Sequence, residues 1–218
     1  MSKKEITKYT DTKYTEDAWS KRADSSKNNP FDNKFSAWGW EPEYRQNIID
    51  WTLSIPDVKS LLDIGCNQGQ YLYELHKRSL NAKLVGIDIT PECIETAKNN
   101  CKKQEIEFDT GDARNLLFRD RQFHTVLFLN VLMHMPDPIE VIKEAARVAN
   151  TYLIVSSYGS KSKRYHTHGR KFLNWRYTKN DVLGFIEHSD GEWDLEGFAE
   201  FENPDGSLIF QYKFKRIN

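Results

Sequence analysis

The sequence predicts an α/β fold: a Rossmann-like, doubly wound sheet of seven strands, mostly parallel, with a C-terminal antiparallel hairpin. Three observations lead to this prediction. Short apolar runs alternate with segments of helical periodicity through the middle of the chain. A glycine-containing turn at residues 65–69 follows the first of these runs. Near the end, two strand-like runs at 193–201 and 207–214 flank Asn203-Pro204-Asp205-Gly206, a strong turn signal.

The strands of the parallel part are recognised as short apolar runs. A helix is expected to begin near Pro42, where apolar residues recur at helical spacing. Buried strands should then lie at 61–64 and 84–88, followed by a short strand at 106–108 and a longer one at 123–130. The first of these strands turns sharply into a helix at the glycine-containing turn.

Helix-start signals separate the later strands. Thr90 is a candidate N-cap before Pro91, which suits the first turn of a helix. Another helix should begin at Pro138, and the strand at 152–155 follows it. Thr178 is the candidate cap of the last helix. This alternation is typical of a doubly wound parallel sheet.

Composition fits one intracellular enzyme domain. The chain has 218 residues and a net charge of −1, so no global attraction to nucleic acid or to an anionic membrane is expected. Its three cysteines, Cys66, Cys93 and Cys101, fit reduced thiols. No apolar run is long enough for a membrane span, and Met1 is followed by polar sequence. We therefore expect a cytoplasmic protein without membrane contact.

The most informative motif is Asp63-Ile64-Gly65-Cys66-Asn67-Gln68-Gly69, at the end of the first strand. A dinucleotide-binding turn has glycine where Asn67 stands, and the Asp63 carboxylate would repel a pyrophosphate. S-adenosylmethionine has no phosphate; it carries a sulfonium and an ammonium group. A carboxylate at a strand end favours such a cation by charge complementarity.

Two further acidic residues follow at later strand ends. Asp88 comes 19 positions after Gly69, at the end of the second strand, where it can accept hydrogen bonds from both hydroxyls of a ribose. Ile89 can pack on an adenine face. Asp112, in Gly111-Asp112-Ala113, can accept from the exocyclic amine of adenine or can simply cap the following turn.

Together these residues resemble the class I S-adenosylmethionine-dependent methyltransferases, from about the helix at Glu43 to the final strand. The family turn is commonly acidic-x-Gly-x-Gly-x-Gly, and this chain departs from it at Asn67, a residue type that tolerates a left-handed backbone. The resemblance implies that S-adenosylmethionine is the cofactor. It places Asp63, Gly65, Cys66 and Gly69 around the methionine moiety, Asp88 and Ile89 at ribose and adenine, Asp112 and Ala113 at adenine, and Leu129 at the middle of the cofactor.

The segment after the fourth strand resembles family members that act on small molecules. It lacks the Asn-Pro-Pro-Tyr or Asp-Pro-Pro-Tyr signature of many nucleic-acid amino methyltransferases. His134, just beyond the strand end, is the first candidate for a general base, because histidine titrates near the operating pH. A purely structural role in the following turn is the alternative.

Acceptor recognition is expected from the basic, aromatic connection at 157–177. By following a strand that ends near the active-site edge, this segment can fold over the acceptor and attract a phosphate or carboxylate. A solvated basic loop is the alternative, and binding of single-stranded nucleic acid is a weaker variant. The candidate acceptor-binding residues are Tyr165, His166, His168, Arg170 and Arg176.

These observations predict an S-adenosylmethionine-dependent methyltransferase that acts on oxygen or nitrogen of a small, anionic metabolite, such as a sugar or natural-product intermediate. An RNA methyltransferase and a catalytically inactive, cofactor-binding regulator are the alternatives. No compact set of metal ligands is expected. Residues 42–218 should form the methyltransferase domain, and the aromatic residues of the segment 1–41 indicate a lid or packing segment.

Overall fold

The computed structural model describes residues 43–135, 137–168 and 173–217. The predicted lid or packing segment at 1–41 and the candidate Arg170 lie outside the described residues. The backbone at His166 and His168 is described, but their side chains are not.

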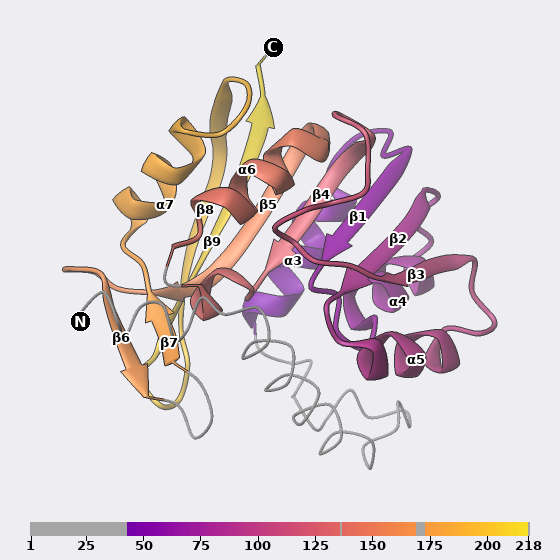
Figure 1. The fold of residues 1–218 in the computed structure, drawn as a ribbon, viewed down its shortest axis with the longest axis horizontal. Helices are drawn as coiled ribbons and strands as arrows, with labels where there is room; N and C mark the ends of the chain where they lie inside the picture. The colour runs from indigo at the N-terminus through magenta and orange to yellow at the C-terminus, as the bar shows by residue number, and fades with distance from the viewer. Residues whose placement is uncertain (1–42, 136, 169–172, 218) are drawn as a thin grey trace.

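A single seven-stranded sheet forms the centre of the molecule, in the order β3-β2-β1-β4-β5-β9-β8 (Figure 1). Neighbours from β3 through to β5 pair in parallel, whereas β9 pairs antiparallel with both β5 and β8. The predicted fold class, including the C-terminal antiparallel hairpin, is therefore confirmed. The strands are β1 (Ser60–Ile64), β2 (Lys83–Asp88), β3 (Ile106–Thr110), β4 (Phe123–Leu129), β5 (Ala149–Gly159), β8 (Trp193–Glu202) and β9 (Leu208–Arg216).

Helices cover both faces of this sheet (Figure 1), which makes it a three-layer structure. One face packs against α6 (Ile139–Val148) and α7 (Lys179–Glu187), with Val126, Leu153 and Ile142 in a shared apolar core. The other face packs against α3 (Glu43–Leu53), α4 (Gln70–Lys77) and α5 (Pro91–Asn100). A short 3-10 helix, η2 (Leu132–His134), follows β4.

The predicted helix starts are correct in position. Thr178 makes a capping box with Asp181, in which each side chain accepts from the backbone N–H of the other residue. Thr90 occupies the N-cap position of α5, but its side chain makes no capping hydrogen bond. Helix α5 therefore begins at Pro91 without the hydroxyl contact that the sequence indicated, and its fixed proline φ is what favours the first turn.

The connection at 157–177 is more ordered than the sequence indicated. Strand β5 runs to Gly159, and the connection folds into a second, two-stranded antiparallel sheet of β6 (Tyr165–His168) and β7 (Leu173–Arg176). Tyr165 pairs with Arg176 and His166 with Trp175. Aromatic residues opposite long side chains favour strand pairing. Because this segment has many basic residues, the sequence indicated a connecting loop and did not predict the two strands. The β6–β7 hairpin lies beside η2 and β5.

Helix α3 is tied to the antiparallel end of the sheet by a buried amide. Gln211 of β9 is fully buried; its Nε2 donates to the backbone oxygen of Tyr44 at 2.5 Å, and its Oε1 accepts from Asn47 at 2.7 Å. These bonds hold the first turn of α3 over β9. In the part of the chain that the structure describes, no helix combines the length and apolar character needed to cross a membrane.

Candidate cofactor and acceptor site

The turn between β1 and α4 requires left-handed backbone at three positions. The φ angles are 75° at Gly65, 52° at Asn67 and 84° at Gly69. Asn67 thus takes the left-handed conformation that its residue type tolerates. A Cβ atom on Gly65 would lie 2.5 Å from Val131, and one on Gly69 would lie 2.7 Å from Phe108. Glycine is needed at these two positions because the backbone is left-handed and because a Cβ atom would be too close to a neighbouring side chain.

Backbone hydrogen bonds tie this turn to the end of β2. The N–H groups of Gly65 and Cys66 both donate to the carbonyl of Ile87, at 2.8 and 2.9 Å. The Asn67 N–H donates to Asp88 Oδ2 at 2.9 Å, and the Thr90 N–H donates to Asp88 Oδ1 at 2.9 Å. Burial raises the pKa of Asp88, and these hydrogen bonds oppose the rise. The Thr90 side chain also donates to Asp88, and the four lone pairs of the carboxylate still leave room for a ligand hydroxyl.

Asp63 is the most unusual group at this edge of the sheet. Its side chain is 1% exposed, and neither carboxylate oxygen has a hydrogen-bond partner. Burial, and after it the nearby charge of Asp88, raises the pKa of Asp63 to about 8. A buried carboxylate without partners is costly unless a cation compensates it. This end of β1 is therefore suited to a positively charged ligand.

The other residues assigned to the cofactor end lie close to this turn. Cys66 is buried, and its thiol, whose pKa is raised by burial, contacts the Asn67 carbonyl at 3.6 Å. Ile89 is half-buried directly after β2, and Leu129 is buried at the end of β4. Because β1, β2 and β4 are parallel neighbours, their carboxyl ends bring these residues to one edge.

Asp112 is already engaged within the protein. Its Oδ2 accepts from Arg114 Nη2 at 2.6 Å, and its Oδ1 accepts from the Arg114 backbone N–H at 2.9 Å. Burial alone would raise the pKa of Asp112, but the hydrogen bonds and charge of Arg114 hold it below its ordinary value. The Asp112 side chain thus caps the turn that follows it, and half-buried Ala113 lies beside it.

Residues 111–122, which connect β3 to β4, are fastened to α6 by an ion pair. Arg147 donates through Nε to Glu144 at 2.7 Å, through Nη1 to Asp120 at 2.7 Å and through Nη2 to the Leu116 carbonyl at 3.0 Å. Glu144 Oε2 accepts from the Leu116 N–H at 2.7 Å. We call the Arg147 and Glu144 pair the α6 clamp. It holds the segment that carries Asp112 and Ala113.

The end of β4 carries a second left-handed residue that is not glycine. Asn130 has a φ of 58°, its N–H donates to the Ser156 carbonyl at 2.9 Å, and its Oδ1 accepts from the buried Ser156 hydroxyl at 3.3 Å. His134 follows in η2 and is half-buried. The Tyr177 hydroxyl donates to the Met135 carbonyl, so the chain after β7 is anchored to the segment after β4.

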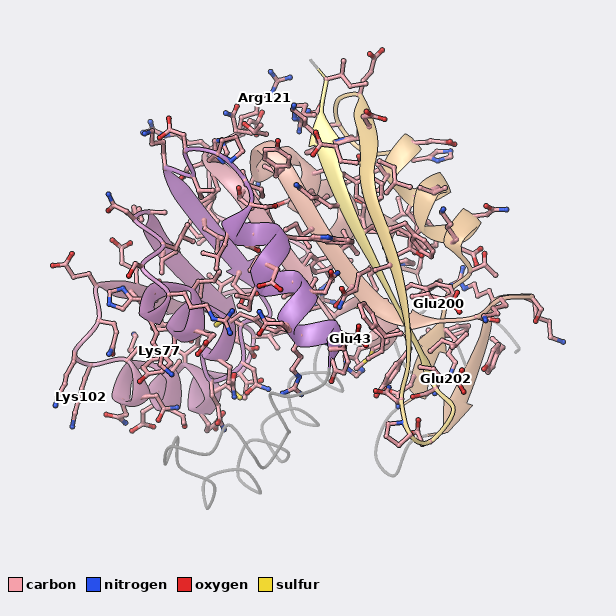
Figure 2. All side chains as sticks on the ribbon, turned by 180° about the vertical axis from the view of Figure 1, so that it is seen from behind. Glu43, Lys77, Lys102, Arg121, Glu200 and Glu202 are labelled. Carbon is pink, nitrogen blue, oxygen red and sulfur yellow. The ribbon has the colours of Figure 1, made fainter. Side chains whose placement is uncertain are left out.

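The described cations of the basic connection have different partners. Lys161, which precedes β6, pairs at 2.7 Å with Glu200 of β8, which is labelled in Figure 2. The Arg164 guanidinium lies 5.0 Å from the Trp175 ring centroid and 4.9 Å from that of Tyr177. Tyr165 is 40% exposed.

Arg176 differs from these two cations. Its guanidinium lies 4.6 Å from the Tyr158 ring centroid, and its Nη1 is buried without a hydrogen-bond partner. Within the described ranges it makes no ion pair. Of the predicted acceptor residues whose side chains are described, Tyr165 and Arg176, it is Arg176 that lies against another element of the domain with an unused donor.

Sequence reasoning missed the contribution of α3 and α4. The pKa of the Tyr71 hydroxyl is raised by burial and is also influenced by Arg45, Tyr44 and Asp63, so these groups lie near one another. The first turn of α3 therefore reaches the same edge as the β1 turn. Only the position of Tyr71 two residues after Gly69 was visible in the sequence, since the approach of α3 depends on the tertiary contact with Gln211.

Among the described residues, no group of three or more histidine, cysteine, aspartate or glutamate side chains is arranged to hold a metal ion.

Comparison with known proteins agrees with this geometry. A family described as methyltransferase domain matches residues 56–191. The chain is 33% identical over 113 residues to the tRNA U34 carboxymethyltransferase of Nautilia profundicola, covering 48% of this chain and 36% of that protein. It is 33% identical over 122 residues to the norajmaline N-methyltransferase of Rauvolfia serpentina, covering 53% of this chain and 41% of that protein. The chain thus spans less than half the length of either relative.

The fold is also found in solved structures. The magnesium protoporphyrin IX methyltransferase from Synechocystis PCC 6803, solved with bound S-adenosylmethionine, superposes with a TM-score of 0.64 at 17% identity, covering 78% of this chain and 77% of that one. At this identity the likeness concerns the fold. With the family match over residues 56–191, it gives a definite assignment. The chain belongs to the class I S-adenosylmethionine-dependent methyltransferases.

Proposed function

We propose that this chain transfers a methyl group from S-adenosylmethionine to an oxygen or nitrogen atom of a small, anionic metabolite. The observation that carries the proposal is Asp63, a buried carboxylate without a hydrogen-bond partner. It lies beside a turn whose left-handed backbone suits glycine and asparagine. A cationic cofactor would supply the missing partner. When bound, S-adenosylmethionine supplies an already electrophilic methyl group.

The residues at the carboxyl edge fit the remaining parts of that cofactor. Asp88 has room left for a ribose hydroxyl beyond the two backbone N–H groups and the Thr90 side chain from which it accepts. Ile89 and Leu129 offer apolar surface. Asp112 can accept from adenine with a lone pair that Arg114 does not use, and Ala113 lies beside it. Gly65, Cys66 and Gly69 allow the backbone to approach the methionine moiety.

The protein's own part in the reaction is mainly alignment and exclusion of water. We propose that His134 accepts the proton of a hydroxyl acceptor, because η2 holds it one turn beyond Asn130 and beside the β6–β7 hairpin. Tyr165, His166, His168 and Arg170 are proposed to lie around the acceptor with Arg176.

The small-molecule acceptor is favoured by how the cations of the hairpin are used. Lys161 is neutralised by Glu200, and Arg164 is stacked on aromatic rings. Glu200 and Glu202 of β8 (Figure 2) both raise the pKa of Lys161, so the described cations of this segment do not form an uninterrupted positive surface for a phosphate backbone. The relative named as a norajmaline N-methyltransferase supports this class of acceptor.

RNA is the second candidate acceptor, because another relative is named as a tRNA U34 carboxymethyltransferase. The third candidate function is a catalytically inactive regulator, which would bind the cofactor without transferring its methyl group. For the site of action we propose the cytoplasm, since Cys66, Cys93 and Cys101 are buried thiols outside any disulfide, as is usual in a reducing compartment.

Transfer from methyl-tritiated S-adenosylmethionine separates these functions. The protein is incubated with a cell extract divided into small anions retained on an anion-exchange column, small neutral molecules, and total RNA. We expect label in the small-anion fraction, produced together with S-adenosylhomocysteine. Label in the RNA alone would establish the second candidate, and cofactor binding without transfer to any fraction would establish the regulator.

A further inference from the structure

Several groups that no cofactor contact explains lie on the same face of the sheet. Ser156 and Tyr158 alternate with residues of the other face along β5, so both side chains lie on the face that α3 covers. Ser156 pairs with Gln211 in the register of β5 and β9, and Tyr158 pairs with Ile209. Because β5 extends beyond the end of β4, Tyr158 stands past the carboxyl edge, next to where the cofactor site ends.

The first of these groups is an amide held in one orientation. The Ser156 hydroxyl donates to Asn130 Oδ1, which leaves the Nδ2 group of Asn130 as the free end of the side chain. Asn130 is half-buried and left-handed, a backbone conformation that costs energy for a residue with a side chain. The arrangement presents two N–H donors beside the end of β4, where an acceptor atom has to meet the methyl group.

The second group is the guanidinium of Arg176. Its central carbon lies 4.6 Å from the Tyr158 ring centroid, and its buried Nη1 donor has no partner. Asp205 is near enough for Arg176 to lower its pKa, after the larger effect of Ser207, but the two side chains form no ion pair. A guanidinium with an unused donor fits a carboxylate or phosphate of a ligand.

Apolar side chains lie on the neighbouring strands next to Tyr158, the residue that Arg176 contacts. Ile209 is 3% exposed and pairs with both Tyr158 and Phe201 in the strand register. The Phe201 ring centroid lies 6.4 Å from that of Tyr44 in the first turn of α3. An anion bound here would therefore be partly removed from water, which strengthens its pairing with Arg176.

From this juxtaposition we infer a two-point acceptor site, in which Arg176 on Tyr158 binds the anionic group and Asn130, oriented by Ser156, donates to the atom that is methylated. Ser156 and Tyr158, which hold the two groups, are two residues apart on one strand, a rise of roughly 7 Å along the backbone. We take a spacing of this order for the acceptor class, which is an oxygen nucleophile that also carries a carboxylate or phosphate. The inference rests on the proposed function.

Small hydroxyaryl acids test this site directly in the protein loaded with S-adenosylhomocysteine. The probes are 4-hydroxybenzoate, its uncharged analogue 4-hydroxybenzamide, and 2-hydroxybenzoate, in which the two groups are adjacent; 4-hydroxyphenylphosphonate replaces the carboxylate by a phosphoryl anion. Binding is followed by NMR titration. We expect at least one of the para acids to bind about tenfold more tightly than the amide, as for a hydrogen bond to a charged group, and more tightly than 2-hydroxybenzoate. The tighter para acid identifies the class of anion.

Variants assign the two points separately. Arg176→Gln should reduce the acid-to-amide ratio to about one, whereas Lys143→Gln, which removes a surface charge paired with Glu140 on α6, should retain it. Asn130→Asp keeps the shape and the left-handed tolerance but removes the donors. It should abolish an advantage of about fivefold that 4-hydroxybenzoate has over benzoate.

The outcomes distinguish this inference from the proposed function. Equal or undetectable affinity for acids and amide in the wild type, or a ratio that survives Arg176→Gln, would overturn the two-point site. S-adenosylhomocysteine is titrated first: if it binds and the discrimination is missing, only the two-point site fails. If the folded protein does not bind it, the proposed function itself fails.

Discussion

The carboxyl edge of the sheet and the α6 clamp differ in whether their charged side chains find hydrogen-bond partners within the protein. In the clamp, every nitrogen of the Arg147 guanidinium donates to an oxygen of the protein. At the edge, Asp63 is less exposed than Arg147, yet both of its oxygens lack a partner, and Arg176 keeps an unused buried donor.

We interpret this difference as one between groups that stabilise the fold and groups that we propose bind a ligand. A buried polar atom without a partner costs about 1–3 kcal/mol. The clamp avoids that cost within the chain, so it should be sensitive to mutation through stability. The edge retains the cost in the ligand-free protein, so its mutation should affect binding or turnover while stability is kept or even improved.

The largest expected effect is on the clamp. Arg147→Met leaves Glu144, Asp120 and the Leu116 carbonyl without their donor and should lower the free energy of unfolding by about 3 kcal/mol. Arg176→Met, a substitution of the same kind at the edge, should change it by less than about 0.5 kcal/mol. Urea unfolding of both variants measures the contrast, and equal losses would remove the distinction between the two regions.

The second effect compares the two ends of β4. His134→Ala, just beyond the carboxyl end, should lower turnover about 100-fold or more if His134 is the base, with cofactor affinity nearly unchanged. His124→Ala is the matched control, because His124 lies at the amino end of the same strand, against Tyr152. Steady-state kinetics with a saturating acceptor would measure the turnover of both variants. Unchanged turnover in His134→Ala would leave His134 with a structural role.

The third effect is the pH dependence that Asp63 gives to the ligand-free protein. Its pKa of about 8 in the folded state lies above the ordinary value in the unfolded chain, so the folded protein binds more protons between these values. Stability should therefore fall as the pH rises, by about 2 kcal/mol between about pH 6 and pH 8. Asp63→Asn should remove most of this slope in urea titrations; an unaltered slope would assign it to other groups.

The smallest effect concerns the backbone of the β1 turn. Asn67→Gly restores the residue that is common in the family at a φ of 52° and should change stability by less than about 0.5 kcal/mol. Asn67→Val, a β-branched residue in the same conformation, should cost about 1–3 kcal/mol. Thermal unfolding compares the two variants. Equal stability of both would mean that the turn has another conformation in solution.

The positions of the residues proposed to bind the cofactor could be predicted from the sequence because their signals are local. Asp63, Gly65, Gly69 and Asp88 belong to strand ends and tight turns, where neighbouring residues determine both backbone and position. The terminal hairpin had an equally local signal in its Asn-Pro-Asp-Gly turn. These elements form in the structure where the sequence indicated them.

The acceptor half could not be read in the same way because its contacts are distant in sequence. Asn130 meets Ser156, Arg176 meets Tyr158, and Gln211 meets the first turn of α3. The β6–β7 hairpin was hidden by the basic character of the connection. For Asp112 the sequence predicted the position after β3 but not the hydrogen bonds with Arg114.

The most direct test of the account is calorimetric binding of S-adenosylmethionine and S-adenosylhomocysteine to the wild type, Asp63→Asn and Asp88→Ala. The account predicts that the wild type binds both, that Asp88→Ala weakens both through the ribose, and that Asp63→Asn weakens S-adenosylmethionine about 100-fold by removing the charge opposite its cationic groups. A folded wild type that binds neither compound, or binding that Asp63→Asn leaves unchanged, would contradict it.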